Sequence, residues 1–197
     1  MKKILMTVAL AALSIPAVAE DNFSGGYVGV QAGTGFSSTL KGKDGKGTVG
    51  GNTMVANLVG GTGSVFSENL YAGAEGQVGT GFGSNRKSES NGVKFHIQPR
   101  GFFTVGGRLG YLPTQEIMLF ASLAAGYEKV NFKGTDAKTG VSPTSSNGFM
   151  MLPGIGAEFK VAQNLNVRAD LSYKYAWHKH STKVRQPIAK LGVVYKF

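Results

Sequence analysis

The stretch Leu165–Trp177, LNVRADLSYKYAW, alternates between two kinds of side chain. Its odd-numbered positions are all apolar or aromatic, whereas its even-numbered positions carry the charges, namely Arg168, Asp170 and Lys174. A period of two residues is typical of a β-strand whose two faces meet different surroundings, and an amphipathic helix would need a period near 3.6. This segment therefore predicts a long β-strand with one apolar and one polar face.

The same alternation recurs along the rest of the chain. The clear segments are Leu70–Phe82, Phe103–Tyr111, Ile117–Tyr127, Phe149–Val161 and Ala189–Phe197, and the weaker, Gly-rich segments are Gly25–Gly33 and Met54–Phe66. With Leu165–Trp177 they make eight predicted strands, each able to turn an apolar face to one side and a polar face to the other.

The connections between these strands alternate in length. Three are tight turns, at Ser67–Asn69, Pro113–Gln115 and Ala162–Asn164, and four are longer polar stretches, at Ser37–Asn52, Ser84–Lys94, Lys133–Asn147 and His178–Lys183. Short turns at one rim and long loops at the other are typical of an outer-membrane barrel with an even number of strands. The sequence thus predicts an all-β, eight-stranded antiparallel up-and-down transmembrane barrel, with periplasmic turns and extracellular loops.

The composition excludes several other classes of protein. The 197 residues contain no Cys, which excludes a disulfide scaffold, a Cys-ligated zinc site and a thiol nucleophile. The mean hydropathy is near zero, so the chain lacks the long apolar runs of a helical membrane bundle. Its 30 Gly residues argue against a helical fold, because glycine destabilises helices.

The first nineteen residues resemble an export signal. Lys2 and Lys3 precede the mostly apolar run Ile4–Ile15, and Ala17-Val18-Ala19 is a small-x-small cleavage signature. We therefore expect residues 1–19 to be a signal peptide and residues 20–197 to form one barrel domain. The alternative is an uncleaved anchor, although the apolar run is short for a membrane span.

A soluble, lipocalin-like barrel is the rival fold, and it would turn the apolar face inward around a ligand. Two features favour the membrane barrel. Aromatic residues gather near both ends of the predicted strands, at Phe82, Phe103, Tyr127, Phe149, Tyr175 and Trp177 on the loop side and at Tyr111, Phe159, Tyr195 and Phe197 on the turn side. Such girdles mark the two interfaces of a membrane.

The second feature is the balance of charges on the polar face. Four acidic and four basic residues share it: Glu75, Glu128, Glu158, Asp170, Arg108, Arg168, Lys174 and Lys190. Charges buried in a narrow lumen persist when they are paired. We interpret this set as a structural ion-pair network, and a narrow porin is the less favoured alternative because eight strands leave little room for water.

Several segments also resemble one known family, the opacity-protein-like family of eight-stranded outer-membrane β-barrels. The segments are GGYVGVQAG (Gly25–Gly33), GAEGQVG (Gly73–Gly79), FTVGGRLGY (Phe103–Tyr111), GIGAEFKV (Gly154–Val161) with the following LNVRADLSYKY, and VVYKF (Val193–Phe197). The chain departs from the family pattern at Phe23, where Trp is more usual, at Gly106, where Arg is common, and at Asp170, where Glu is more frequent.

This resemblance implies a place in the bacterial outer membrane, periplasmic termini and surface-exposed loops. It also implies periplasmic chaperones and the barrel-insertion machinery as partners, the latter through the terminal Phe197. It leaves the function open, since members of the family serve as structural proteins, adhesins or ligand binders.

The predicted loops carry the excess positive charge. Counted over Ser37–Asn52, Ser84–Ile97, Asn131–Gly148 and Trp177–Pro187, they hold three acidic and eleven basic residues, the latter being Lys41, Lys43, Lys46, Arg86, Lys87, Lys94, Lys133, Lys138, Lys179, Lys183 and Arg185. A rim of one sign attracts polyanions. We expect contact with outer-membrane lipid and lipopolysaccharide, and host glycans or surface proteins are further candidates; a solvated rim that binds nothing specific is the alternative.

Catalysis and cofactor binding find little support. His178, His180 and Ser181 lie at one strand end, but adjacent positions on a strand face opposite ways and no carboxylate is near to orient an imidazole. His178 and His180 share a face but lack a third ligand, so they are weak metal or haem candidates. We expect a non-enzymatic envelope protein without cofactor or nucleic-acid partner, with an adhesin or haem-binding surface protein as the alternative and a lipid A-modifying enzyme as a less favoured one.

Overall fold

The structure is a computed structural model, and it describes residues 22–36, 38–42, 45–49, 52–82, 88–90, 93–136, 140–178 and 182–197. The predicted signal peptide, residues 1–19, lies outside these ranges. Within them no helix has the length and apolar character needed to cross a membrane.

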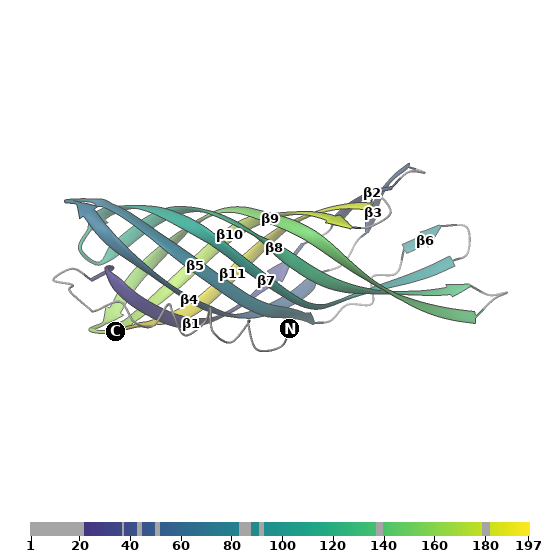
Figure 1. Cartoon of the computed structure of the whole chain (residues 1–197), viewed down its shortest axis with the longest axis horizontal. Helices are drawn as coiled ribbons and strands as arrows, with labels where there is room; N and C mark the ends of the chain where they lie inside the picture. Colours follow the sequence, from purple (N-terminus) through teal and green to yellow (C-terminus); the bar gives the residue numbers. More distant parts are fainter. Residues whose placement is uncertain are drawn as a thin grey trace, which may run out of the picture.

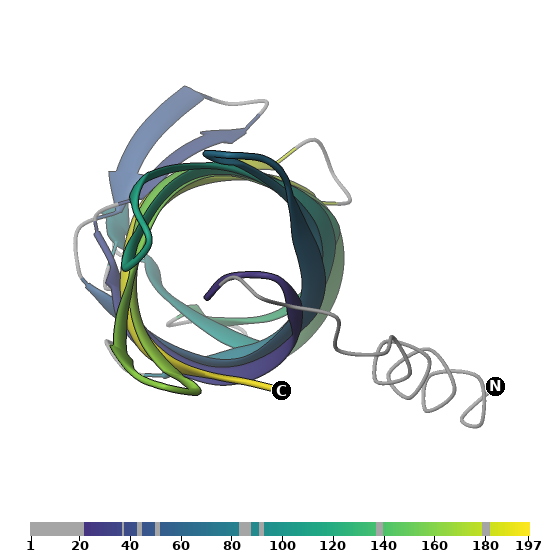
Figure 2. The ribbon, with the colours of Figure 1, turned by 90° about the vertical axis from the view of Figure 1, so that its left-hand side faces the viewer.

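Eight antiparallel strands close into a barrel (Figures 1 and 2). They are β1 (Gly25–Gly35), β4 (Thr53–Ser67), β5 (Leu70–Phe82), β7 (Val93–Thr114), β8 (Ile117–Asp136), β9 (Gly140–Ala162), β10 (Leu165–His178) and β11 (Thr182–Lys196). Each pairs with its neighbour in the chain, and β11 pairs with β1 from Tyr27–Lys196 to Gly35–Ile188, which removes the free edges. The predicted fold class is confirmed.

Three short strands extend the wall at the end away from the C-terminus (Figure 1). They are β2 (Ser38–Gly42), β3 (Gly45–Val49) and β6 (Ser88–Ser90); β2 pairs with both β11 and β3, and β6 pairs with β7. Much of what the sequence analysis assigns to loops is therefore strand.

The strands β7, β8 and β9 are also longer than predicted, at 22, 20 and 23 residues. The alternation that predicted Phe103–Tyr111 and Ile117–Tyr127 stops where the strands continue past the outer aromatic residues. Beyond the bilayer both faces of a strand meet water, so no apolar face is required and the period of two fades while the backbone pairing continues.

The apolar face of the alternation is the outer face of the barrel. Leu171 and Leu191 are 58% and 66% exposed, whereas Arg168, on the alternate face of β10, is 1% exposed. This arrangement is the reverse of a soluble carrier, which buries its apolar face. Exposed aliphatic side chains on the outward face of the barrel strands form the band that a hydrocarbon layer covers.

Aromatic rings lie at both ends of this outer band. On the loop side, Phe149 lies between Tyr127 and Trp177, with ring centroids 5.7 and 5.9 Å apart. On the turn side, Tyr111, Phe159, Tyr195 and Phe197 are exposed on the same outward face. Phe66, which is not among the predicted girdle residues, is another exposed ring near the turn-side end of β4.

Glycines on the inner wall make room for large inward side chains. A Cβ atom at Gly61 would lie 2.5 Å from the Tyr27 hydroxyl, and one at Gly73 would lie 2.5 Å from the Tyr71 hydroxyl. Both distances are too short for a real contact, so the two tyrosine rings fold against the wall only because these positions lack side chains. The high glycine content thus has a packing reason in this barrel.

Candidate functional site

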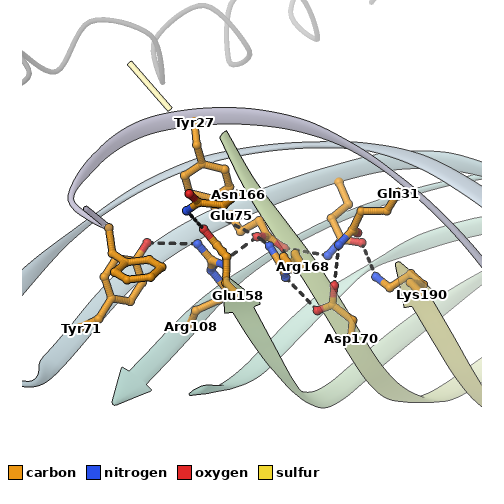
Figure 3. A network of polar contacts seen from close by, with 12 residues as sticks. Tyr27, Gln31, Tyr71, Glu75, Arg108, Glu158, Asn166, Arg168, Asp170 and Lys190 are labelled. Carbon is orange, nitrogen blue, oxygen red and sulfur yellow. Dashed lines mark hydrogen bonds and ion pairs between the residues drawn. The ribbon is translucent and has the colours of Figure 1, made fainter. Parts of the chain in front are cut away.

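The lumen holds a network of polar side chains centred on Glu75 (Figure 3). The Glu75 carboxylate accepts a hydrogen bond of 2.7 Å from the Tyr27 hydroxyl and is ion-paired with Arg168. Nε of Arg108 lies 3.5 Å from the same carboxylate. One carboxylate from β5 therefore faces two guanidinium groups, from β7 and β10, and all three side chains are buried.

From this centre the network extends in two directions (Figure 3). Toward one end, Arg108 donates to Glu158 at 3.0 Å and to the Tyr71 hydroxyl at 3.1 Å. Toward the other end, Arg168 donates to Asp170 at 2.9 Å. Because each Arg lies between two acceptors, it links groups that would otherwise be unpaired charges in a space without bulk water.

Uncharged side chains extend the hydrogen bonding, and the predicted network omits them. The side-chain amide of Asn166 donates to Glu158 at 2.7 Å, and that of Gln31 donates to Asp170. Lys190 donates to Gln77 at 3.1 Å. The full set of omitted uncharged partners is Tyr27, Gln31, Asn57, Tyr71, Gln77 and Asn166. Their signal in the sequence is their place on the charged face of each strand.

The guanidinium groups also stack on aromatic rings. Cζ of Arg108 lies 4.7 Å from the centroid of the Tyr27 ring and 5.2 Å from that of Phe120, and Cζ of Arg168 lies 4.7 Å from the Phe120 centroid. The weakly hydrated, planar guanidinium suits such stacking, which an ammonium group could not reproduce as well. The lumen is thereby filled by packing as well as by pairing.

The eight charges predicted for the lumen fall into two separate groups. Glu128 and Lys174 lie toward the loop end, where they pair at 2.9 Å. Nε2 of His178 lies 3.3 Å from the same Glu128 carboxylate. The other six belong to the network around Glu75, so the set is not one continuous array. His178, a weak metal candidate in the sequence, is buried beside this ion pair.

A fifth lumen base, Lys196, is missing from the prediction. Its side chain is buried, donates to the backbone carbonyl of Phe23 and lies 3.9 Å from Glu158. Phe23 is itself fully buried, and Lys160 donates to the side-chain carbonyl of Asn22 just before it. The start of the described chain is therefore tied into the turn-side end of the lumen.

Apolar layers lie on both sides of the central network. On the turn side, Phe23 packs in a cluster with Tyr71, Leu112, Met118 and Phe120. On the loop side, Met150, Ala176 and Val184 form a second cluster, with Phe102 and Leu152 against it. Between them a cavity of about 20 Å³ is lined by Glu75, Arg108, Ser122, Asp170, Ser172 and Lys190, among others. That volume suits about one water molecule.

The predicted basic rim is described only in part. The side chains of Lys183 and Arg185 are described and exposed, and only the backbone is described for Lys41, Lys46, Lys94 and Lys133. The remaining predicted rim bases, Lys43, Arg86, Lys87, Lys138 and Lys179, lie outside the described residues.

Sequence comparison agrees with this architecture. The family model of the outer membrane protein beta-barrel domain matches residues 5–197. The chain belongs to this family. No curated protein is detectably similar in sequence. As an outer-membrane barrel, the protein lies in the bacterial outer membrane with its apolar band in the lipid.

Solved structures resemble this outer-membrane barrel in fold. Ail, the attachment invasion locus protein of Yersinia pestis, is 20% identical with a TM-score of 0.51, and 88% of this chain and 99% of that chain are covered. Neisserial surface protein A is 17% identical with a TM-score of 0.51, with coverages of 88% and 98%. Ail in complex with the heparin analogue sucrose octasulfate is 21% identical with a TM-score of 0.48, covering 88% and 99%. At such identities the likeness concerns the fold.

The described residues do not complete the catalytic or metal sites that the sequence suggested for this outer-membrane barrel. His180 and Ser181 lie outside the described residues, and His178 points into the lumen toward Glu128. Among the residues that the structure describes, no three His, Asp or Glu side chains gather as a metal site would require.

Proposed function

We propose that this protein is a non-enzymatic surface protein of the outer membrane whose extracellular rim binds polyanions, either lipopolysaccharide or sulfated host glycans. The observation that carries the proposal is the separation of charge. The four predicted lumen acids are each ion-paired, whereas the rim segments hold eleven basic and three acidic residues. A surface with net positive charge attracts anions from outside the protein.

The closed lumen supports a surface role over a transport role. The central ion-pair network lies between two apolar clusters, and the cavity between them has room for about one water molecule. An eight-stranded barrel is filled by its own side chains. Function in such a barrel therefore resides in the extracellular end, where β7, β8 and β9 extend past the outer aromatic belt.

The second candidate function is adhesion to a host surface. The long β7–β8 and β8–β9 pairings, which reach from Lys94–Thr135 and Asp136–Gly140 at the outer end down to the turns, support it. A paired strand extension presents side chains on a stiffer platform than an irregular loop does, which lowers the entropy lost on binding.

Binding of the refolded, full-length protein to immobilised heparin and to lipopolysaccharide tests the proposal. We expect retention that falls steeply between low and high salt, because exposed charges are screened by salt. Sucrose octasulfate, the heparin analogue bound to Ail, serves as a soluble competitor. Retention that is absent at low salt, or that is independent of salt, would rule out polyanion binding by the rim; attachment of protein-coated beads to host cells, abolished by heparinase, would favour the adhesin.

A further inference from the structure

Three neighbouring strands at the outer end of the barrel align their lysines. In the β11–β2 pairing, Lys183 lies opposite Lys41, and in the β2–β3 pairing, Lys41 lies opposite Lys46. Directly opposed positions in an antiparallel pair are on the same face of the sheet. The three lysine positions therefore form one row across β11, β2 and β3, which lie side by side at the end of the barrel away from the C-terminus (Figure 1).

The next row on the same face contains one arginine and two threonines. Arg185 lies opposite Thr39, and Thr39 lies opposite Thr48. We call these six positions the outer patch: Lys183, Lys41, Lys46, Arg185, Thr39 and Thr48. None of the six is acidic.

On β11, the outer patch faces away from the lumen. Lys183 and Arg185 are exposed and share the alternation of the lipid-facing Leu191 and Val193 on β11, whereas Val184 between them is buried. Because positions opposite them on β2 and β3 are on that same face, the whole patch continues the outer surface of the barrel wall.

Aromatic residues set the depth of the outer patch. Lys183 lies opposite Trp177, which stacks on Phe149 in the outer aromatic belt. The guanidinium carbon of Arg185 lies 5.6 Å from the centroid of the Tyr175 ring. Since aromatic belts mark the interface between hydrocarbon and headgroups, the patch lies at headgroup depth.

Like charges opposite each other destabilise a sheet unless a counter-ion lies between them. Phosphate groups meet this need, because each offers several oxygens to ammonium, guanidinium and hydroxyl donors. An anion that belongs to the membrane is at the right depth, whereas a soluble glycan would reach the rim from above.

Resting on the proposed polyanion binding, we propose that the outer patch binds the phosphate groups of a phosphorylated lipid in the outer leaflet. The row of Lys183, Lys41 and Lys46 supplies positive charge for the phosphates. Arg185, in the adjoining row, adds a guanidinium group that lies over the Tyr175 ring. One lipid-headgroup site would then lie on the side of the barrel formed by β11, β2 and β3.

The test measures binding of bis-phosphorylated lipid A and of phosphate-free lipid A to the full-length protein in mixed detergent micelles. The patch variant carries Lys41→Glu, Lys183→Glu and Arg185→Glu. The control variant carries Lys94→Glu, Lys129→Glu and Lys133→Glu, the same change of net charge on the paired strands β7 and β8. Circular dichroism checks that both variants fold.

We expect the patch variant to bind bis-phosphorylated lipid A at least about tenfold more weakly, because a hydrogen bond between charged partners contributes about one decade of affinity. The control variant should lose less than about threefold, and phosphate-free lipid A should bind the native protein as weakly as the patch variant binds the phosphorylated form. Equal losses in the two variants, or no preference for phosphate, overturn the assigned site.

These outcomes are distinct from those of the heparin experiment. Salt-dependent heparin binding that persists alongside equal losses in the two variants would leave the polyanion function in place and remove only the outer patch. Native protein that binds neither heparin nor phosphorylated lipid would remove both.

Discussion

At the scale of single residues, Glu75 is the centre of the lumen. It receives the Tyr27 hydroxyl, pairs with Arg168 and lies within 3.5 Å of Arg108. Removing one partner of a buried ion pair leaves an uncompensated charge, which costs far more than the pair itself contributes to stability. The carboxylate is therefore the position at which a small chemical change should have a large effect.

The substitution Glu75→Gln keeps the shape of the side chain and removes its charge, which leaves two guanidinium groups without their shared partner. We expect the free energy of unfolding to fall by about 3 kcal/mol. Urea unfolding in detergent micelles or lipid vesicles, followed by the fluorescence of the single tryptophan, Trp177, measures this change.

The matched control is Glu68→Gln. Glu68 is exposed in the turn between β4 and β5 and should change stability by less than about 0.5 kcal/mol. Equal effects of the two substitutions would show that the charge at Glu75 does not stabilise the barrel.

At the scale of the strand, each barrel strand separates the lipid from the lumen. On β10 the outward residues from Leu165 to Trp177 are mostly apolar and exposed, and the inward Asn166, Arg168 and Asp170 are buried. A strand with this division is stable only if lipid covers one side and the lumen network covers the other. The depth of an outward position in the bilayer then determines how much a charge at that position lowers the free energy of unfolding.

The substitution Leu171→Arg places a charge on the outward face near the middle of β10. We expect a loss of about 2 to 4 kcal/mol in the free energy of unfolding in lipid vesicles, as for a basic residue near the bilayer midplane. The comparison is Val161→Arg, on the same outward face near the turn end of β9, which should cost about 0 to 1 kcal/mol.

A spin label at Leu171 gives an independent measurement. It should report acyl chains rather than water, because the side chain is on the lipid-facing side. If Leu171→Arg and Val161→Arg had the same cost, or if the label were accessible to water, the outward face would not be in hydrocarbon.

At the scale of the whole molecule, closure of the sheet converts eight amphipathic strands into a sealed cylinder. Figure 2 shows the strands as a ring seen along the barrel. Side chains fill that ring: Arg108 and Arg168 stack on aromatic rings, and Phe23 closes the turn side. We therefore expect the barrel to conduct no solute.

Reconstitution in planar lipid bilayers tests the sealed lumen. We expect no discrete conductance steps, because the described lumen has apolar layers at both ends of its ion-pair network. A general porin reconstituted in the same membrane is the positive control. Regular steps from purified protein that has no porin contaminant would contradict a closed lumen.

Much of the fold was accessible from the period of two. The alternation in Leu165–Trp177 and its counterparts predicts the barrel strands and the side of each that faces lipid, because the bilayer requires an apolar outward face and the lumen accepts a polar one. The same signal fails beyond the outer belt, where β7, β8 and β9 continue in water, and in β2 and β3, which the sequence analysis assigns to a loop.

The alternation along each strand specifies which residues face inward, because a strand turns successive side chains to opposite sides. Which of these inward residues contact one another depends on how the sheet closes. Arg168 contacts Glu75 across a separation of 93 residues, and Tyr27 contacts Glu75 across 48. The tilt of the strands and the register between β1 and β11 set those contacts, and they are properties of the closed sheet, which no single strand encodes.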